Sequence, residues 1–231
     1  MSDDLPQMKA KGSAAAARIL RLDELAGSIA PSNEPVRWGL DALRGRLIEL
    51  SARGATATLT AAVELVLEAQ IAGEPAGWIS LFESTFYPPD VAETGVDLAA
   101  LSVVQVRDAT TAARAAERLL RSGAFGLVVM DLGALGALGA LGGLGGEPLD
   151  LPAAHQGRLV TLAQTHDAAI VCITEKPAES PSLGSLVSLR AEAMRIRDRE
   201  HGHEMSLRVL KDKRRGPGWS RRLKLRGPSG F

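Results

Sequence analysis

The chain contains a single cysteine, Cys172, which excludes an intrachain disulfide and any metal site built from cysteines. Cys172 lies within the apolar run AAIVCIT, and such a setting favours a buried, inert thiol over a nucleophile. Aromatic residues are also scarce, at 3% of the chain, although hydrophobic residues reach 45%. Leu, Val, Ile and Ala must therefore supply most of the core.

Long apolar runs are absent too. None reaches the roughly 18 residues that a membrane-spanning helix needs, and the polar N-terminus has no pattern of a secretory signal. We therefore expect a cytoplasmic protein. The length of 231 residues suits one main domain, which we place at residues 41–231. Residues 1–40 form a short N-terminal segment, in which we expect disorder and one helix over Ala14–Leu25.

The net charge is zero, but the charges are unevenly distributed. Residues 190–231 hold 13 Lys and Arg against 5 Asp and Glu, a net charge of +8, and residues 1–189 hold 14 against 22, a net charge of −8. An acidic body with a basic C-terminal end indicates a binding partner, because a uniformly neutral surface would lack this polarity.

Apolar strand-like segments alternate with helical segments from residue 47 to residue 174. The predicted strands are Leu47–Ser51, Ala76–Leu81, Leu101–Val106, Leu127–Asp131 and Ala168–Thr174. The predicted helices are Ala57–Ala72, Asp90–Thr94, Ala109–Ser122 (capped by Asp108) and Ala153–His166. This alternation predicts an α/β fold with a mostly parallel sheet and helices on both faces.

Beyond Ser180 the pattern changes to strands without intervening helices. Leu186–Arg197, Glu204–Lys211 and Ser220–Arg226 are predicted as antiparallel strands added at the C-terminal edge of the sheet. Upstream, the low-complexity tract Gly133–Gly146 (GALGALGALGGLGG) is predicted to be a flexible loop, since its glycines disfavour a helix.

The segment Gly45–Gly73 has the strand, turn and helix order of a phosphate-binding loop. Such a loop needs G-x-x-x-x-G-K-[ST], in which backbone N–H groups and the lysine hold the phosphates and the hydroxyl holds Mg²⁺. The sequence here, GRLIELSARGATATLTAAVELVLEAQIAG, contains no such lysine. The segment therefore has the architecture of the loop without its chemistry.

Several segments together resemble the RecA recombinase core, over roughly Gly45–Gly227. They are GRLIEL, TLT with EAQIAG, GVDLAAL, RLLRSGAFGLVVMDLGAL, and RVLKDK before a Gly-Pro turn. The resemblance implies a RecA-like core, with the phosphate-loop positions at Ala52, Arg53, Gly54, Ala55, Thr56, Ala57, Thr58 and Leu59. Alanine then replaces both glycines, Thr58 replaces the lysine, and Leu59 replaces the metal-binding hydroxyl.

The same resemblance identifies further losses. Asp131 matches the Walker B carboxylate, whereas Phe82 stands in place of the catalytic glutamate and Thr174-Glu175 in place of an Asn-Gln pair. One DNA-binding loop is shortened to KPAESPSLGSL, and the Gly-Leu tract replaces the other. The resemblance therefore implies a pseudo-ATPase without catalytic residues, nucleotide cofactor or metal.

Residues are replaced at both the nucleotide-binding and the DNA-binding positions, and in this the chain resembles the ImuA-type proteins. These are RecA-like accessory factors encoded with error-prone polymerase components in bacterial mutagenesis cassettes. This implies a non-enzymatic role in DNA-damage tolerance (SOS mutagenesis and translesion synthesis) through contacts with RecA and the polymerase accessory subunit. Two alternatives remain open. One is an atypical nucleotide-binding ATPase that uses Asp131, a hydroxyl of Thr58 or Thr60, and Lys211 and Lys213 in trans. The other is a SulA-like cell-division inhibitor.

The basic C-terminal end is a candidate binding surface for DNA or a protein partner. Its residues are Lys211, Lys213, Arg214, Arg215, Trp219, Arg221, Arg222, Lys224 and Arg226. Positive charge beside an aromatic ring suits phosphate contact and base stacking. A solvated edge strand or docking on an acidic protein explains the same composition. In a strand, Arg222 and Lys224 share one face and Arg221 lies on the other.

Overall fold

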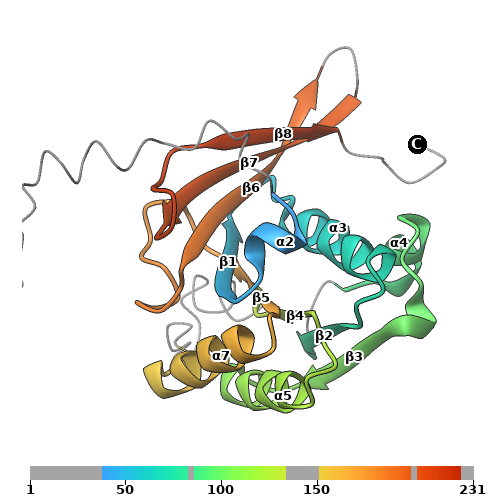
Figure 1. Ribbon diagram of the computed structural model, residues 1–231. Coiled ribbons are helices and arrows are strands. Elements are labelled where there is room, and N and C mark those ends of the chain that lie inside the picture. Colours follow the sequence, from blue (N-terminus) through green and yellow to red (C-terminus); the bar gives the residue numbers. More distant parts are fainter. Residues whose placement is uncertain (1–37, 83–85, 134–150, 199–201, 225–231) are drawn as a thin grey trace, which may run out of the picture. The chain divides into compact units, whose positions relative to one another are not determined.

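The strands form one sheet with β1 and β5 near its centre (Figure 1). They are β1 (Arg46–Ala52), β2 (Ala76–Leu81), β3 (Leu101–Val106), β4 (Leu127–Asp131), β5 (Ala169–Glu175), β6 (Leu189–Asp198), β7 (Gly202–Asp212) and β8 (Ser220–Lys224). Their order across the sheet is β3-β2-β4-β5-β1-β6-β7-β8. The fold is therefore the predicted α/β arrangement.

The computed structural model describes residues 38–82, 86–133, 151–198 and 202–224, all of which belong to one compact unit. The predicted helix Ala14–Leu25 and residues 134–146 of the Gly-Leu tract lie outside the described residues. Within the described part of the chain, no helix is long and apolar enough to cross a membrane.

Strand direction matches the prediction except at β6. The strands from β3 to β1 pair in parallel, and β7 and β8 are antiparallel additions at the C-terminal edge. β6 pairs antiparallel with β7 as predicted, but on its other side it runs parallel to β1, with Ile48 opposite Leu189, which the prediction did not include. The reason is the connector over residues 176–188, which returns the chain to the amino end of the sheet before β6 begins.

Helices cover both faces of the sheet (Figure 1). They are α2 (Leu40–Leu43), α3 (Thr58–Ile71), α4 (Pro88–Glu93), the 3₁₀ turn η1 (Leu98–Ala100), α5 (Ala109–Arg121) and α7 (Ala153–Thr165). The helices α2 and α3 pack on one face with Trp38 and Trp78, and α5 and α7 pack on the other. Burial on both faces explains why the central strands are continuous apolar runs.

Local chemistry fixes several of these elements. Asp108 caps α5, because its carboxylate accepts hydrogen bonds from the N–H and the hydroxyl of Thr111 at 2.8 and 2.9 Å. Gly77 allows α5 to approach β2, since a Cβ there would lie 2.8 Å from Leu119 Cδ1. The sequence predicts the cap, whereas it does not predict the short helix α2.

A buried ion pair joins the start of β1 to the end of β7. The Arg46 guanidinium donates to Asp212 Oδ1 at 2.6 Å and to the Ser188 side chain and carbonyl at 3.0 and 3.1 Å. Both charged side chains are almost fully buried. Burial lowers the pKa of Arg46, and the bond to Asp212 opposes that shift.

We predict that Arg46→Ala lowers the free energy of unfolding by about 3–5 kcal/mol, because it leaves the Asp212 carboxylate buried without its cation. Arg208→Ala is the matched control in the same sheet. Arg208 pairs with Glu192 at 2.8 Å but is half-exposed, so its loss should cost less than about 1 kcal/mol. Urea denaturation measures both changes, and equal costs would contradict the prediction.

Candidate functional site

The degenerate phosphate loop joins β1 to α3 at the carboxyl end of the sheet. Ala52 is buried at the end of β1, and Arg53, Gly54, Ala55 and Thr56 are exposed. The chain reverses at Gly54, whose φ of +89° is strained for any other residue. Ala57 and Thr58 then return to the core, and Leu59, which the resemblance to RecA matches to the metal-binding hydroxyl, packs against the α3 side of the core.

After this reversal the loop pairs with β6. The Ala57 N–H donates to the Ala193 carbonyl at 2.9 Å, and the Arg195 N–H donates to the Ala55 carbonyl at 2.8 Å. Thr56 forms an antiparallel bridge with Met194 between these two bonds. The loop is thus bound to the strand beside it.

Further hydrogen bonds within the loop use more of its backbone N–H groups. The Thr56 N–H donates to the Gly54 carbonyl at 2.8 Å, and the Thr58 N–H donates to Thr56 Oγ1 at 3.2 Å. The two threonine hydroxyl oxygens lie 2.9 Å apart. A phosphate loop works by directing several N–H groups at its ligand. Here the N–H groups of Thr56, Ala57 and Thr58 have partners within the protein.

The remaining positions around the loop do not restore the missing chemistry. Asp131 ends β4, is buried, and accepts a hydrogen bond from the Gly133 N–H at 3.3 Å. Phe82, which the resemblance to RecA matches to the catalytic glutamate, is 60% exposed. The adjacent Glu83 lies outside the described residues. Asp131 is therefore the one carboxylate of the predicted nucleotide site, and the structure places it at the end of β4.

Sequence reasoning missed a second charged site, centred on Glu49 in the middle of β1. Glu49 is fully buried, and its carboxylate lies 2.6 Å from Lys176 Nζ. It also accepts hydrogen bonds from the Thr174 hydroxyl and the Leu183 N–H, each at 2.8 Å. An acid within an otherwise apolar strand was the signal that could have revealed this cluster.

The Glu49 cluster fixes the connector over residues 176–188, the segment that the resemblance to RecA matches to a DNA-binding loop. Arg190, opposite Glu49 on β6, lies 3.9 Å from its carboxylate and donates to the carbonyls of Pro177 and Ser180. Burial lowers the pKa of Arg190, and the Glu49 charge opposes the shift. The connector is therefore tied at both ends to buried charges.

The basic C-terminal end does not form one surface. Lys211 donates to the Ser182 hydroxyl at 3.1 Å and Lys213 to the Ser185 carbonyl at 2.6 Å, so both hold the connector. Burial first, and then the charge of Lys213, lowers the pKa of Lys211. These lysines act mainly as anchors.

The rest of the basic residues divide between two faces. Arg221 lies opposite Leu207 on the core-facing side of β8 and donates to the Trp38 carbonyl at 3.0 Å. Arg222 is exposed on the other face, and Lys224 follows it two positions along β8. Arg214, Arg215 and Trp219 line a pocket near α2. Arg226 lies outside the described residues.

Comparison with known proteins agrees with this geometry. The RecA N-terminal domain family matches residues 36–175, which is more than half of the chain. The chain therefore belongs to this family. A crystal structure of the RadB recombinase superposes with a TM-score of 0.58 and 17% sequence identity, over 80% of this chain and 92% of the RadB chain. That likeness shows a shared fold. A search of curated proteins gave no match.

The loop geometry predicts slow hydrogen exchange at the amides of Ala57 and Arg195, because both are bonded across the loop–β6 pairing. Millimolar ATP with Mg²⁺ should leave the amide signals of residues 53–59 unshifted. Amide-resolved NMR measures both. Fast exchange at Ala57 would contradict a stable pairing of the loop with β6, and shifts across the loop on adding ATP would show that the loop binds phosphate.

Proposed function

We propose that this RecA-family chain is a non-enzymatic pseudo-ATPase that acts as an accessory factor in DNA-damage tolerance. The observation that carries the proposal is the pairing of the former phosphate loop with β6 through Ala57 and Ala55. Hydrolysis of ATP needs a phosphate cradle, metal ligands and an oriented water. The backbone N–H groups that would form the phosphate cradle are instead hydrogen-bonded within the protein. The lysine of a phosphate loop is missing.

The DNA-binding machinery expected of a RecA-like core is altered as well. The connector over residues 176–188 is short and tied to Glu49, Arg190 and Lys211. Strand exchange requires loops that rearrange around DNA, and a connector fixed by buried charges does not suit that task. The RecA-like scaffold is retained, whereas the residues for ATP hydrolysis and for strand exchange are altered. This combination supports a role in binding other proteins.

The edge strand β3 is a suitable surface for a protein partner. Among the described residues β3 pairs only with β2, and Val103 on it is 46% exposed. Its sequence, LSVVQV, has no charge and no proline, the residues that usually protect edge strands from pairing. A partner segment can add to such an edge through main-chain hydrogen bonds.

Within the RecA-like proteins, the pattern of losses supports the ImuA-type group. The proposed partners are then RecA and the accessory subunit of the error-prone polymerase, with DNA as a further ligand. The proposed role is in SOS mutagenesis and translesion synthesis.

Calorimetric titration with ATP and Mg²⁺ should show no binding in the micromolar range. Asp131→Ala should leave complementation of a damage-sensitive deletion strain unchanged, because the proposed function requires no metal at this carboxylate. Clear micromolar ATP binding, or loss of complementation by a stably folded Asp131→Ala variant, would instead support the atypical ATPase.

Pull-down tests the partner surface. We expect Val103→Lys to reduce capture of RecA or the polymerase accessory subunit at least about tenfold, because a charge on the edge strand opposes strand addition. Leu186→Lys is the matched control, since it places the same charge at another exposed apolar side chain, in the connector. Failure of the parent chain to capture either partner would refute the proposed function. Equal loss in both variants would refute the role of β3.

A further inference from the structure

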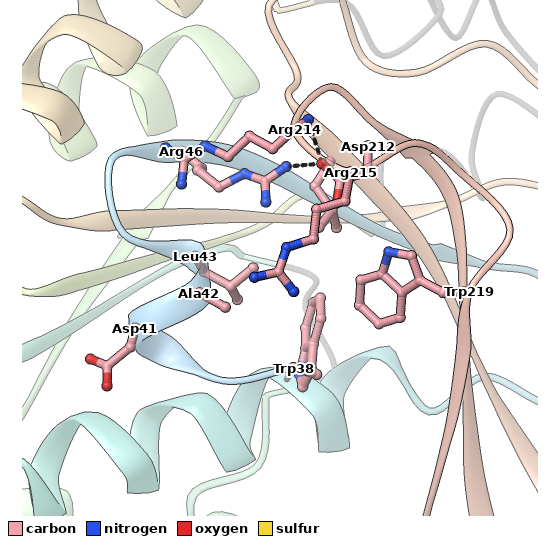
Figure 2. Close-up of a pocket in the computed structure, with 10 residues that line it drawn as sticks. Trp38, Asp41, Ala42, Leu43, Arg46, Asp212, Arg214, Arg215 and Trp219 are labelled. Carbon is pink, nitrogen blue, oxygen red and sulfur yellow. Dashed lines mark hydrogen bonds and ion pairs between the residues drawn. The ribbon is translucent and has the colours of Figure 1, made fainter. Parts of the chain in front are cut away.

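A pocket of about 210 Å³ lies at the opposite end of β1 from the phosphate loop (Figure 2). Arg46 at the start of β1 lines it, and Ala52 at the other end leads into the loop. At ~3.3 Å per residue, these ends are about 20 Å apart. We call it the tryptophan pocket, because Trp38 and Trp219 line it. It is therefore separate from the phosphate loop.

Part of the wall of the tryptophan pocket is apolar. Besides the two indole rings, Ala42, Leu43 and Leu189 line it. Trp38, Leu43 and Leu189 belong to the core on the α3 side, and Trp219 packs against that core. A cavity of about 150 Å³ admits benzene, so this pocket has room for one aliphatic or aromatic side chain.

Arginines dominate the polar part of the wall. The charged lining residues are Arg46, Arg214, Arg215, Asp41 and Asp212. Asp212 pairs with Arg46 at 2.6 Å, and Asp41 pairs with Arg44 at 3.3 Å. Each acid at the pocket thus already has a cation, and the remaining positive charges are those of Arg214 and Arg215.

Arg214 and Arg215 have no acidic partner. Both are exposed, and neither makes an ion pair within the described residues. The Arg214 guanidinium donates to the Arg44 carbonyl at 3.4 Å, and Figure 2 shows the Arg215 guanidinium directed into the pocket toward Trp38. Burial lowers the pKa of Arg46, and the charges of Arg214 and Arg215 lower it further. The pocket therefore holds two like charges that a bound anion would neutralise.

The wall offers few hydrogen bonds to the rest of a ligand. The indole N–H groups of Trp38 and Trp219 are buried below the pocket surface, and so is Oδ2 of Asp212. A group with a polar edge, such as a nucleobase, would lose hydrogen bonds to water there without replacing them, which is unfavourable. An aliphatic or phenyl side chain has no such bonds to lose. The ligand that fits has an apolar group beside an anion.

The small size of the pocket indicates where that anion lies on a peptide. Neighbouring side chains of an extended peptide point to opposite sides, so an acid next to an apolar residue in the pocket would point away from it. The C-terminal residue of a peptide carries a carboxylate on the same Cα as its side chain. Arginine pairs with a carboxylate through two parallel hydrogen bonds, and capture of a terminal carboxylate is a recurring mode of peptide recognition.

From this geometry we infer that the tryptophan pocket binds the C-terminal residue of an acidic protein tail. The last side chain is apolar and contacts Trp38 and Trp219, and the terminal carboxylate pairs with Arg214 and Arg215. Residues 190–231 hold 13 Lys and Arg against 5 Asp and Glu, so acidic residues before the terminus also meet a basic surface. This inference goes beyond the proposed function, because the surface is not β3 and the tail can belong to another protein.

Fluorescence anisotropy with the full chain tests the inference. The probe is a fluorescein-labelled peptide of aspartate and glycine that ends in phenylalanine with a free carboxylate. We expect binding to weaken at least about tenfold when the terminus is amidated, because the amide removes the charge that the arginines pair with. A terminal glycine in place of the phenylalanine should also weaken binding, because it leaves the apolar part of the pocket empty.

The double variant Arg214→Ala/Arg215→Ala should lose the preference for the free carboxylate over the amide. Ala42→Leu narrows the pocket without a change in charge, so it should weaken the phenylalanine peptide more than the glycine peptide. Arg208→Ala/Arg222→Ala is the matched control, which removes two charges from the face of the sheet opposite to Arg221 and should keep the preference. Circular dichroism verifies that every variant folds.

Four results would overturn the inference. The first two are equal affinities for the free and amidated peptides and an unchanged preference in the Arg214→Ala/Arg215→Ala variant. The third is an equal loss in the control, which would indicate general attraction to a basic surface. The fourth is displacement of the probe by oligothymidylate at lower concentration than by the unlabelled peptide, which would assign the arginines to nucleic acid. None of these measurements involves ATP, RecA or β3, so the proposed function stands or fails separately.

Discussion

The buried carboxylate of Glu49 is the constraint on which the rest of the structure depends. A charge in the middle of a sheet requires partners, and it takes them from Lys176, the Thr174 hydroxyl, the Leu183 N–H and, at longer range, Arg190. These contacts determine the path of the connector, and the connector delivers β6 beside β1 in the parallel direction. β6 is in turn the strand to which the former phosphate loop is bonded. Glu49 is therefore linked, through the connector and β6, to the loop between β1 and α3.

The loop between β1 and α3 keeps the strand, turn and helix order of a phosphate loop without its lysine. A phosphate loop is a strand, a turn and a helix whose N–H groups are directed at an anion. Once the lysine is absent, those N–H groups need other acceptors, since an unpaired one near the core is costly. The carbonyl of Ala193 supplies one, and a threonine hydroxyl supplies another. The strand, the turn and the helix stay because Leu50, Ala61 and Val66 are core residues whatever the loop binds.

Periodicity predicted much of this fold and little of its strand pairing. Ala76–Leu81, Leu101–Val106 and Leu127–Asp131 have the predicted bounds, because each is an apolar run between turn residues. The order of apolar and polar residues along a strand indicates which of its faces are buried, but not which strand lies beside it. The parallel pairing of β6 with β1 was therefore not predicted. Alternation did separate Arg221 from Arg222. It could not place Trp38 and Trp219 around one pocket, because that depends on how the segment before α2 and the turn between β7 and β8 meet in space.

The unprotected edge of β3 has a consequence for the behaviour of the chain in solution. Main-chain hydrogen bonds do not depend on which side chains the added strand has. An edge strand that can pair with a strand of a partner can therefore also pair with a strand of another copy of this chain. Self-association then rises with the concentration of chains whose edge is uncovered. A partner present in equal amount suppresses it by mass action. Whether this chain stays monomeric would then depend on the amount of a partner that covers β3 as well as on its own sequence.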